Sequence, residues 1–236
     1  MPIAMFLLLP PLAPSADPRY LYRASFVQAA PGKLLDLIDY YKTSAVALAA
    51  AGEEPPLWIR HSQGDKWDLM LLFPMESYAA YYQPGRIAKR DDLDRKGQGR
   101  LRELVAWHED LFVYGPPLSD LRSGFSNAGF FHLEIFQSLP GKHDELYRQR
   151  QMENAYLKAL KRPENFIFIR DQGASWDLFT LGLYRDIKHY AESADIPQKD
   201  QEAAAKSAGF EAANRIGPYL RTLISAHHDT LAVAIK

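Results

Sequence analysis

The chain has 236 residues, of which 47% are hydrophobic and 24% are charged, and this length suffices for one large or two small globular domains. Its formal net charge of -1 provides no overall field to attract nucleic acid or an anionic membrane surface, so we expect no nucleic-acid partner. The absence of cysteine excludes disulfides, thiolate zinc sites and cysteine nucleophiles.

Residues 1–18 predict an export signal or a disordered N-terminus. Ile3 to Leu12 form an apolar run, and the small residues of Ala13-Pro14-Ser15-Ala16 follow it, as in a signal peptide with its cleavage region. The run is shorter than the roughly 20 residues that a spanning helix needs. We therefore expect a periplasmic or secreted protein without a transmembrane segment, and a cytoplasmic protein if the run is not a signal.

Residues 19–115 carry alternating strand and helix patterns. Aromatic and β-branched residues mark the strands, apolar residues at helical spacing mark the helices, and Pro31-Gly32 and Gln63-Gly64-Asp65 mark turns. The predicted elements are, in chain order, a strand over 20–28, a helix over 34–48, strands over 57–61 and 67–73, a helix over about 91–110 and a strand over 111–114. Their order is β-α-β-β-α-β.

The same order returns in residues 129–236, after a linker over 116–128 that begins with two prolines. The predicted elements are a strand over 130–137, a helix over 142–160, strands over 166–170 and 176–183, helices within about 199–226 and a strand over 231–235. On the helix over 142–160, Arg150 and Glu153 occupy positions where an apolar stripe is expected. We expect this helix to meet solvent or a partner there.

Local sequence matches indicate that the second set of elements is a copy of the first. Pro31-Gly32-Lys33 recurs 109 residues later (140 − 31) as Pro140-Gly141-Lys142. The letters IR, QG and WDL recur in the same order around the two hairpins, between Ile59 and Leu69 and between Ile169 and Leu178. The sequence thus predicts an α+β protein made of two tandem ferredoxin-like repeats, whose antiparallel sheets cover each other.

In element order and duplication, the chain after Arg19 resembles the dimeric α/β-barrel superfamily, with both halves fused in one chain. That superfamily includes NIPSNAP-like proteins, antibiotic-biosynthesis monooxygenases and stress-responsive barrel proteins. The resemblance implies a ligand cavity between the two sheets. The resemblance extends to the haem-binding chlorite dismutase-like proteins, which duplicate this fold and carry an axial histidine in the second half. No motif of theirs is found in this sequence.

Strand alternation suggests which side chains line that cavity. Ala24 and Phe26, like their counterparts in the second copy, form an apolar face that we expect under the helices. The other face then points into the barrel, and its polar residues are the ligand-binding candidates Arg23, Ser25, His132 and Glu134.

His132 and Glu134 lie side by side on one strand face, an arrangement suited to general acid–base catalysis or to two ligands of a metal. A metal would need a third ligand, for which His61, His108 and His228 are candidates. The competing interpretation is a structural ion-pair network with Arg23. No metal or cofactor is assigned.

Other repeated residues favour structural roles. Trp67-Asp68 and Trp176-Asp177 stand at strand starts, where an aspartate can accept backbone N–H groups, and ion pairs from Arg60 and Arg170 to these aspartates would span the hairpins.

The histidines His108 and His228 occupy matching positions that we expect near helix ends, where a histidine can cap carbonyl groups. If they line the mouth of the cavity instead, they join the ligand-binding candidates.

Three functions stay open from the sequence. The leading one is a monomeric barrel protein that binds a small, partly apolar molecule between its sheets. The second is a cofactor-independent or metal-assisted monooxygenase-like enzyme in which His132 and Glu134 handle protons or bind metal. The third is a structural or interaction module whose barrel is filled with side chains.

Overall fold

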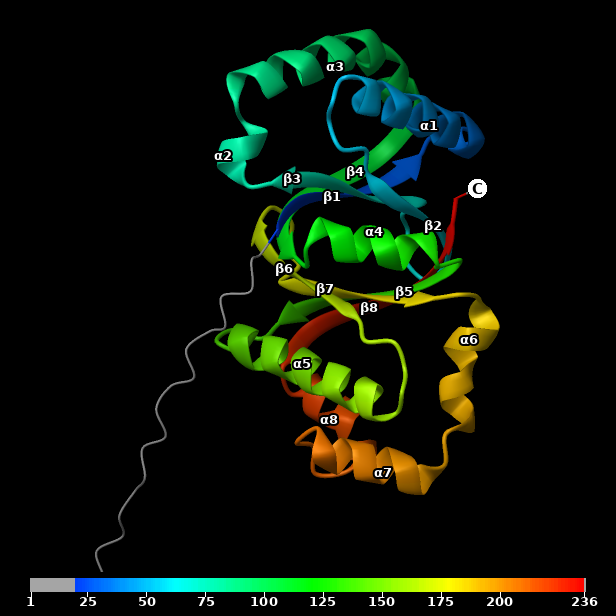
Figure 1. Cartoon of the computed structure of the whole chain (residues 1–236), viewed down its shortest axis with the longest axis vertical. Helices are drawn as coiled ribbons and strands as arrows, with labels where there is room; N and C mark the ends of the chain where they lie inside the picture. The colour runs from blue at the N-terminus through cyan, green and yellow to red at the C-terminus, as the bar shows by residue number, and fades with distance from the viewer. Residues whose placement is uncertain (1–19, 236) are drawn as a thin grey trace, which may run out of the picture.

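The computed structural model describes residues 20–235, which form a mixed α+β fold around one antiparallel eight-stranded sheet closed into a barrel (Figure 1). The strands are β1 (Tyr20–Ala29), β2 (Leu57–Gln63), β3 (Leu69–Glu76), β4 (Val105–Gly115), β5 (Phe130–Ser138), β6 (Phe166–Gln172), β7 (Leu178–Tyr184) and β8 (Ile224–Ala234). The helices are α1 (Leu34–Ala50), α2 (Tyr78–Tyr81), α3 (Pro84–Leu104), α4 (Leu118–Ser126), α5 (His143–Ala159), α6 (Ile187–Ala191), α7 (Gln198–Ser207) and α8 (Ile216–Arg221), with short 3-10 turns at Glu192–Asp195 and Ala213–Arg215.

The strands run around the barrel in the order β1-β3-β2-β8-β5-β7-β6-β4. We refer to β1–β4 with α1–α3 as the first half and to β5–β8 with α5–α8 as the second half. The halves meet where β2 pairs with β8 and where β4 pairs with β6, and we refer to these two junctions as the seams. Backbone hydrogen bonds across both seams leave no free sheet edge among the described strands.

A glycine allows close backbone approach at each seam. Gly64, in the turn between β2 and β3, has a φ of 125°, and a Cβ there would lie 2.3 Å from the carbonyl oxygen of Asp229. Gly173, in the turn between β6 and β7, has a φ of 83°, and its Cβ would lie 2.6 Å from the carbonyl oxygen of Asp110. Only glycine fits both the conformation and the space at these positions.

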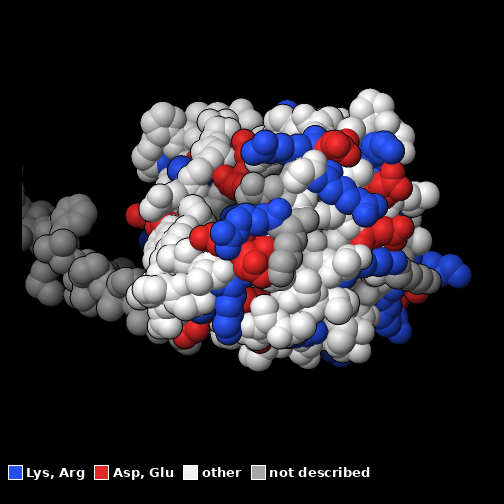
Figure 2. Space-filling model, turned by 90° about the horizontal axis from the view of Figure 1, so that it is seen from above, with Lys and Arg blue, Asp and Glu red and all other residues white. Residues whose placement is uncertain are grey.

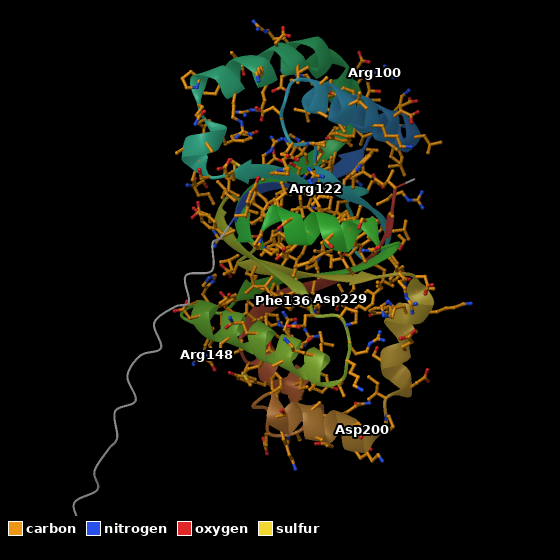
Figure 3. All side chains as sticks on the ribbon, in the orientation of Figure 1. Arg100, Arg122, Phe136, Arg148, Asp200 and Asp229 are labelled. Carbon is orange, nitrogen blue, oxygen red and sulfur yellow. The ribbon has the colours of Figure 1, made fainter. Side chains whose placement is uncertain are left out.

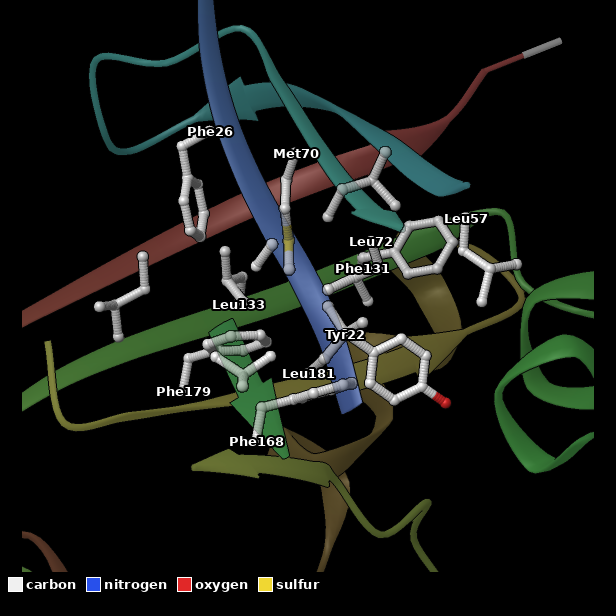
Figure 4. Packing of buried hydrophobic residues seen from close by; sticks show 14 of the residues in the cluster. Tyr22, Phe26, Leu57, Met70, Leu72, Phe131, Leu133, Phe168, Phe179 and Leu181 are labelled. Atoms are coloured by element: carbon white, nitrogen blue, oxygen red, sulfur yellow. The ribbon is translucent and has the colours of Figure 1, made fainter. Parts of the chain in front are cut away.

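The interior of the barrel is filled with apolar side chains from both halves (Figure 4). They include Tyr22, Phe26, Leu57, Met70, Leu72, Phe131, Leu133, Phe168, Phe179 and Leu181. The apolar strand face that the sequence analysis placed under the helices is therefore the interior face, and that prediction was wrong. A closed interior without water cannot hydrate charged groups, so the more apolar face is the one enclosed.

The outer face of each half is covered by its own helices, as Figure 1 shows for α1 and α3 above and α5, α7 and α8 below. In the first half, Leu37 and Leu104 pack on Val27 and neighbouring strand residues. In the second half, Leu146 and Leu220 pack with Phe136 and Leu178. The polar candidates of β1 and β5 lie in these layers between sheet and helices, outside the barrel.

The segment over 116–128, predicted as a linker, contains α4. Leu121 of α4 is fully buried with the interior residues, and the ring of Phe125 lies 5.0 Å from that of Phe131. The connection between the halves therefore also covers part of the barrel.

Two strands are longer than the sequence predicts. β4 begins at Val105 and β8 at Ile224, in segments where helix was expected. Each strand pairs along its length with the first strand of its own half, and these tertiary hydrogen bonds override local helix propensity. His108 and His228 are consequently strand residues, so the prediction that they cap helix ends was wrong.

Positive and negative side chains are interspersed on the surface seen from above in Figure 2. None of the helices formed by residues 20–235 combines the length and hydropathy that a bilayer-spanning helix needs. The predicted export signal lies outside the described residues.

Candidate functional site

The polar cluster that stands out lies on the outer face of the second half, on two neighbouring strands. His132 and Glu134 come from β5, and His227 and Asp229 come from β8. Glu134 is paired with Asp229 in the register, and Phe136 is paired with His227. Because alternate residues of a strand share a face, all four side chains project toward the helices.

Helix α5 covers this cluster with polar residues of its inward face. Arg150 and Gln149 are fully buried beside the apolar Leu146. The Arg150 guanidinium donates to Glu134 Oε2 at 3.3 Å, to Gln149 Oε1 at 2.7 Å and to Glu153. Burial raises the pKa of Glu153. The polar positions of this helix therefore face the sheet, whereas the sequence analysis expected solvent or a partner there.

The four side chains on the strands lie within contact distance of one another. His132 Nε2 is 3.3 Å from Asp229 Oδ1, and His227 Nε2 is 3.2 Å from the same oxygen and 3.6 Å from Glu134 Oε1. Thr180 of β7 donates to the other oxygen of Glu134 at 3.1 Å. These distances place two imidazoles and two carboxylates around one small volume.

Aromatic rings border the cluster. The ring of Tyr190, from α6, lies 5.3 Å from that of His132 and 5.6 Å from that of Phe130. The ring of Phe136 stacks on that of His227 at 5.2 Å, and the Arg150 guanidinium lies over the Phe136 ring, 4.7 Å from its centroid. The site thus combines an apolar border with a polar centre, as small-molecule sites commonly do.

Asp229 connects the cluster to solvent. Its side chain is 54% exposed, whereas those of His227 and Glu134 are 9% and 12% exposed. Asp229 and His227 line an open depression of about 470 Å³ with His228 and the Gly64–Lys66 turn. The depression thus exposes the Asp229 side of the cluster to solvent, while His132 and Glu134 do not line it. Figure 3 labels Phe136 and Asp229 on the part of the sheet that lies above α5.

The charges of the cluster stabilise one another. The pKa of His227 is raised to about 9, mainly by Asp229 and next by Glu134, while burial opposes the shift. Burial alone would raise the pKa of Asp229, but His132 and His227 outweigh it and lower the pKa. Burial also opposes ionisation of Glu134, whose pKa is nevertheless lowered by His227 and by Arg150.

The candidates of the first half are not part of this site. Arg23 and Ser25 lie on the outer face of β1, where Ser25 donates a hydrogen bond to Asp110 and Arg23 Nη1 is 4.0 Å from that carboxylate. Arg23 also lies over the ring of Phe73, 4.4 Å from its centroid. The predicted pairing of Arg23 with His132 or Glu134 across the barrel interior was wrong, because both sets face outward from opposite halves.

The other histidine candidates are dispersed. His108 is exposed on the outer face of β4, paired in register with Val27. His228 Nδ1 is 3.1 Å from Asp65, and the ring of His228 lies 4.9 Å from that of Trp176. The ring of His61 lies 5.6 Å from that of Trp67. None of these three has a described contact with His132 or Glu134.

The repeated Trp-Asp positions have the structural role that the sequence predicts. Asp68 Oδ2 accepts from the backbone N–H of Ala29, and Asp177 Oδ2 accepts from that of Ser138, at 2.8 and 2.7 Å. Arg170 pairs with Asp177 at 2.8 Å, as expected. Within residues 20–235 no equivalent pair joins Arg60 to Asp68.

Haem does not fit this cluster. An axial histidine needs a ring nitrogen that faces a flat apolar slot, not carboxylates. Nε2 of His132 faces Asp229, and Nε2 of His227 faces both Asp229 and Glu134. The imidazole nitrogens and carboxylate oxygens of the cluster suit a small cation or a polar substrate group.

His227 and Asp229 were not predicted as partners of His132 and Glu134. The signal was present as a second His-x-acid motif, His227-x-Asp229, matching His132-x-Glu134. A metal cluster at His227-His228-Asp229 received little weight because that segment was predicted to be helical, where adjacent residues face different directions.

No known protein family matches the sequence, and no curated protein matches it either. An anthrone oxidase-like protein superposes with a TM-score of 0.61 at 12% identity, over 94% of this chain and 93% of its own. A protein from Fusobacterium nucleatum subsp. nucleatum named as a monooxygenase superposes at 0.56 and 10% identity, over 92% and 93% of the two chains. Another from Lactobacillus acidophilus superposes at 0.51 and 6%, over 91% and 93%. These likenesses show that the chain shares the mixed α+β barrel fold of these three proteins.

Proposed function

We propose that the protein is a monooxygenase-like enzyme whose active site is the outer-face cluster of the second half. The observation that carries the proposal is the concentration of His132, Glu134, His227 and Asp229 beneath the buried guanidinium of Arg150. Structural networks also use such residues, but the access through Asp229 and the aromatic border favour a ligand. The monooxygenase-like proteins that share the fold support the same reaction class.

The reaction that suits this site is oxidation of an activated methylene group by dioxygen. One C–H proton passes to a base, and the resulting carbanion reduces dioxygen. One oxygen atom becomes the new carbonyl oxygen, and the other leaves as water with the two hydrogens of the methylene. The substrate supplies all the electrons, so the balance requires no separate reductant.

In this reaction His132 or Glu134 accepts the proton, and the positive charge of Arg150 stabilises the negative charge that develops. Tyr190 and Phe130 provide the surface against which an aromatic substrate packs. The substrate class is therefore a small aromatic molecule with an acidic methylene group.

Dioxygen uptake with anthrone as the probe tests this function, after subtraction of the rate without enzyme. We expect uptake by the wild-type protein and a loss of about 100-fold or more in Glu134→Gln and His132→Ala, as for removal of a general base. His108→Ala removes an exposed histidine from β4 of the first half, and we expect its rate to match the wild type. No enzyme-dependent uptake, or equal rates in all variants, contradicts the proposal.

A second candidate is the structural or interaction module, which the filled barrel interior favours. It predicts that the protein has no uptake activity and that the cluster serves to dock α5. The binding of a ligand between the two sheets, our leading expectation from the sequence, is disfavoured because apolar side chains occupy that space.

We also propose that the chain arose by tandem duplication and that the protein is exported. Tandem duplication of a ferredoxin-like unit is supported by the strand orders β4-β1-β3-β2 and β8-β5-β7-β6 and by the equivalent glycines Gly64 and Gly173. Export is supported by the apolar run of Ile3 to Leu12. Mass measurement of the mature protein from its host tests export, since cleavage near Ala16 removes that run.

A further inference from the structure

The spacing of ligand atoms in the cluster matches that around a metal ion. One ring nitrogen of His132 and one oxygen each of Glu134 and Asp229 form a group whose ligand atoms all lie within 4.8 Å of one another. Asp229 Oδ1 lies 3.3 Å from Nε2 of His132 and 3.2 Å from Nε2 of His227. Bonds of about 2.0–2.1 Å at tetrahedral angles separate ligand atoms by about 3.3–3.4 Å.

A buried imidazole nitrogen faces the same volume. The His227 side chain is 9% exposed, and its Nε2 has no hydrogen-bond partner of acceptable geometry among the described residues. This atom nevertheless lies 3.2 Å from Asp229 and 3.6 Å from Glu134. Metal ligands bind in their deprotonated form, so a cation between the two carboxylates would take the place of the proton on this nitrogen.

The surrounding hydrogen bonds leave one oxygen of Glu134 free for such an ion. Arg150 and Thr180 both donate to Oε2, whereas Oε1 faces His227. Carboxylates that bind metals are commonly oriented by hydrogen bonds of this kind to their other oxygen. Asp229 is the most exposed member and provides the route by which an ion enters.

We propose that this cluster binds one divalent first-row transition-metal ion through His132, Glu134 and Asp229, with His227 as a fourth ligand. Imidazole and carboxylate together select Mn²⁺, Fe²⁺ or Zn²⁺ over Mg²⁺ and Ca²⁺, which prefer oxygen ligands alone. The inference deepens the proposed function by naming what the site binds, and it rests on that function for any role in turnover.

The test is a titration of the full-length protein, freed of metal with EDTA and dialysed, with Mn²⁺ in the presence of excess Mg²⁺. Free Mn²⁺ is counted by electron paramagnetic resonance, and Co²⁺ in its place reports imidazole ligation by visible absorption. We expect one equivalent bound by the wild type. Asp229→Asn and His132→Ala should weaken binding about 10-fold or more, and His132→Ala should alter the Co²⁺ spectrum.

Asp110→Asn is the matched control, because Asp110 pairs with Ser25 in the first half as Asp229 pairs with Glu134 in the second. We expect it to bind Mn²⁺ as the wild type does. No wild-type binding at millimolar Mn²⁺, equal binding by all variants, or equal weakening in Asp110→Asn overturns the proposal. His132→Gln replaces any variant that circular dichroism shows to be unfolded.

The two proposals fail in different ways. Bound metal without dioxygen uptake contradicts the enzyme but not the metal site. Uptake that persists in EDTA, in a protein that binds no Mn²⁺, contradicts the metal site but not the enzyme. Binding is measured without substrate, so neither result depends on the other.

Discussion

Arg150 shows how a charged side chain can occupy the core-facing stripe of a helix. Its side chain is 2% exposed, and three polar side chains and the ring of Phe136 surround its guanidinium. Burying a charge is costly unless opposite charges and hydrogen bonds compensate for it. The acidic residues on the sheet and on α5 provide this compensation, so the cluster is stable only as a set.

The first prediction concerns the removal of that guanidinium. We expect Arg150→Ala to lower the free energy of unfolding by about 3 kcal/mol or more, since it leaves Glu134 and Glu153 buried without their partner. Arg148→Ala, at an exposed position of the same helix, should change it by about 0.5 kcal/mol or less. Urea unfolding measures both, and equal effects would show that the Arg150 contacts do not stabilise the fold.

At the scale of elements, the site depends on β8 being a strand from Ile224 onward. In a strand, His227 and Asp229 share one face and meet β5, whereas in a helix they would diverge. The sequence pattern of this segment is ambiguous, and long-range pairing with β5 decides it. The seams also depend on long-range contacts, because the turn that follows β2 touches β8 and the turn that follows β6 touches β4.

The second prediction concerns the close approach at the seams. We expect Gly64→Ala to lower the free energy of unfolding by more than about 2 kcal/mol, because the methyl group meets the backbone of Asp229 in a conformation already unfavourable for alanine. Gly173→Ala should behave similarly against Asp110. Gly32→Ala is the control, with a φ of 75° but nothing within 4 Å of the new methyl group. A loss for Gly32→Ala as large as that for Gly64→Ala would contradict the role of the seam.

At the scale of the whole molecule, the two halves share one interior. Phe26 of the first half lies 6.4 Å, ring to ring, from Phe179 of the second, and Tyr22 lies 5.8 Å from Phe168. Neither half can enclose these side chains alone, because each contributes one side of the barrel. The chain thus has two halves but a single hydrophobic interior.

The third prediction follows from that shared interior. We expect one cooperative thermal transition, with equal calorimetric and van't Hoff enthalpies. Phe26→Ala should shift the whole transition and lower stability by about 3–5 kcal/mol, since cavities in the barrel affect both halves. Differential scanning calorimetry measures this, and two separable transitions would show that the halves fold independently.

Sequence alone was sufficient for the order of the eight strands, the turns at Pro31-Gly32 and Gln63-Gly64, and the structural role of Asp177, because local residue preferences decide these features. Only tertiary packing decided which face of β1 and β5 is enclosed. Both faces are covered, one by the opposite half and one by helices, so alternation distinguishes two faces without saying which is inside. Closure of the barrel excludes water from one face, which placed Phe26 inside and left His132 and Glu134 to meet His227 and Asp229 beneath α5.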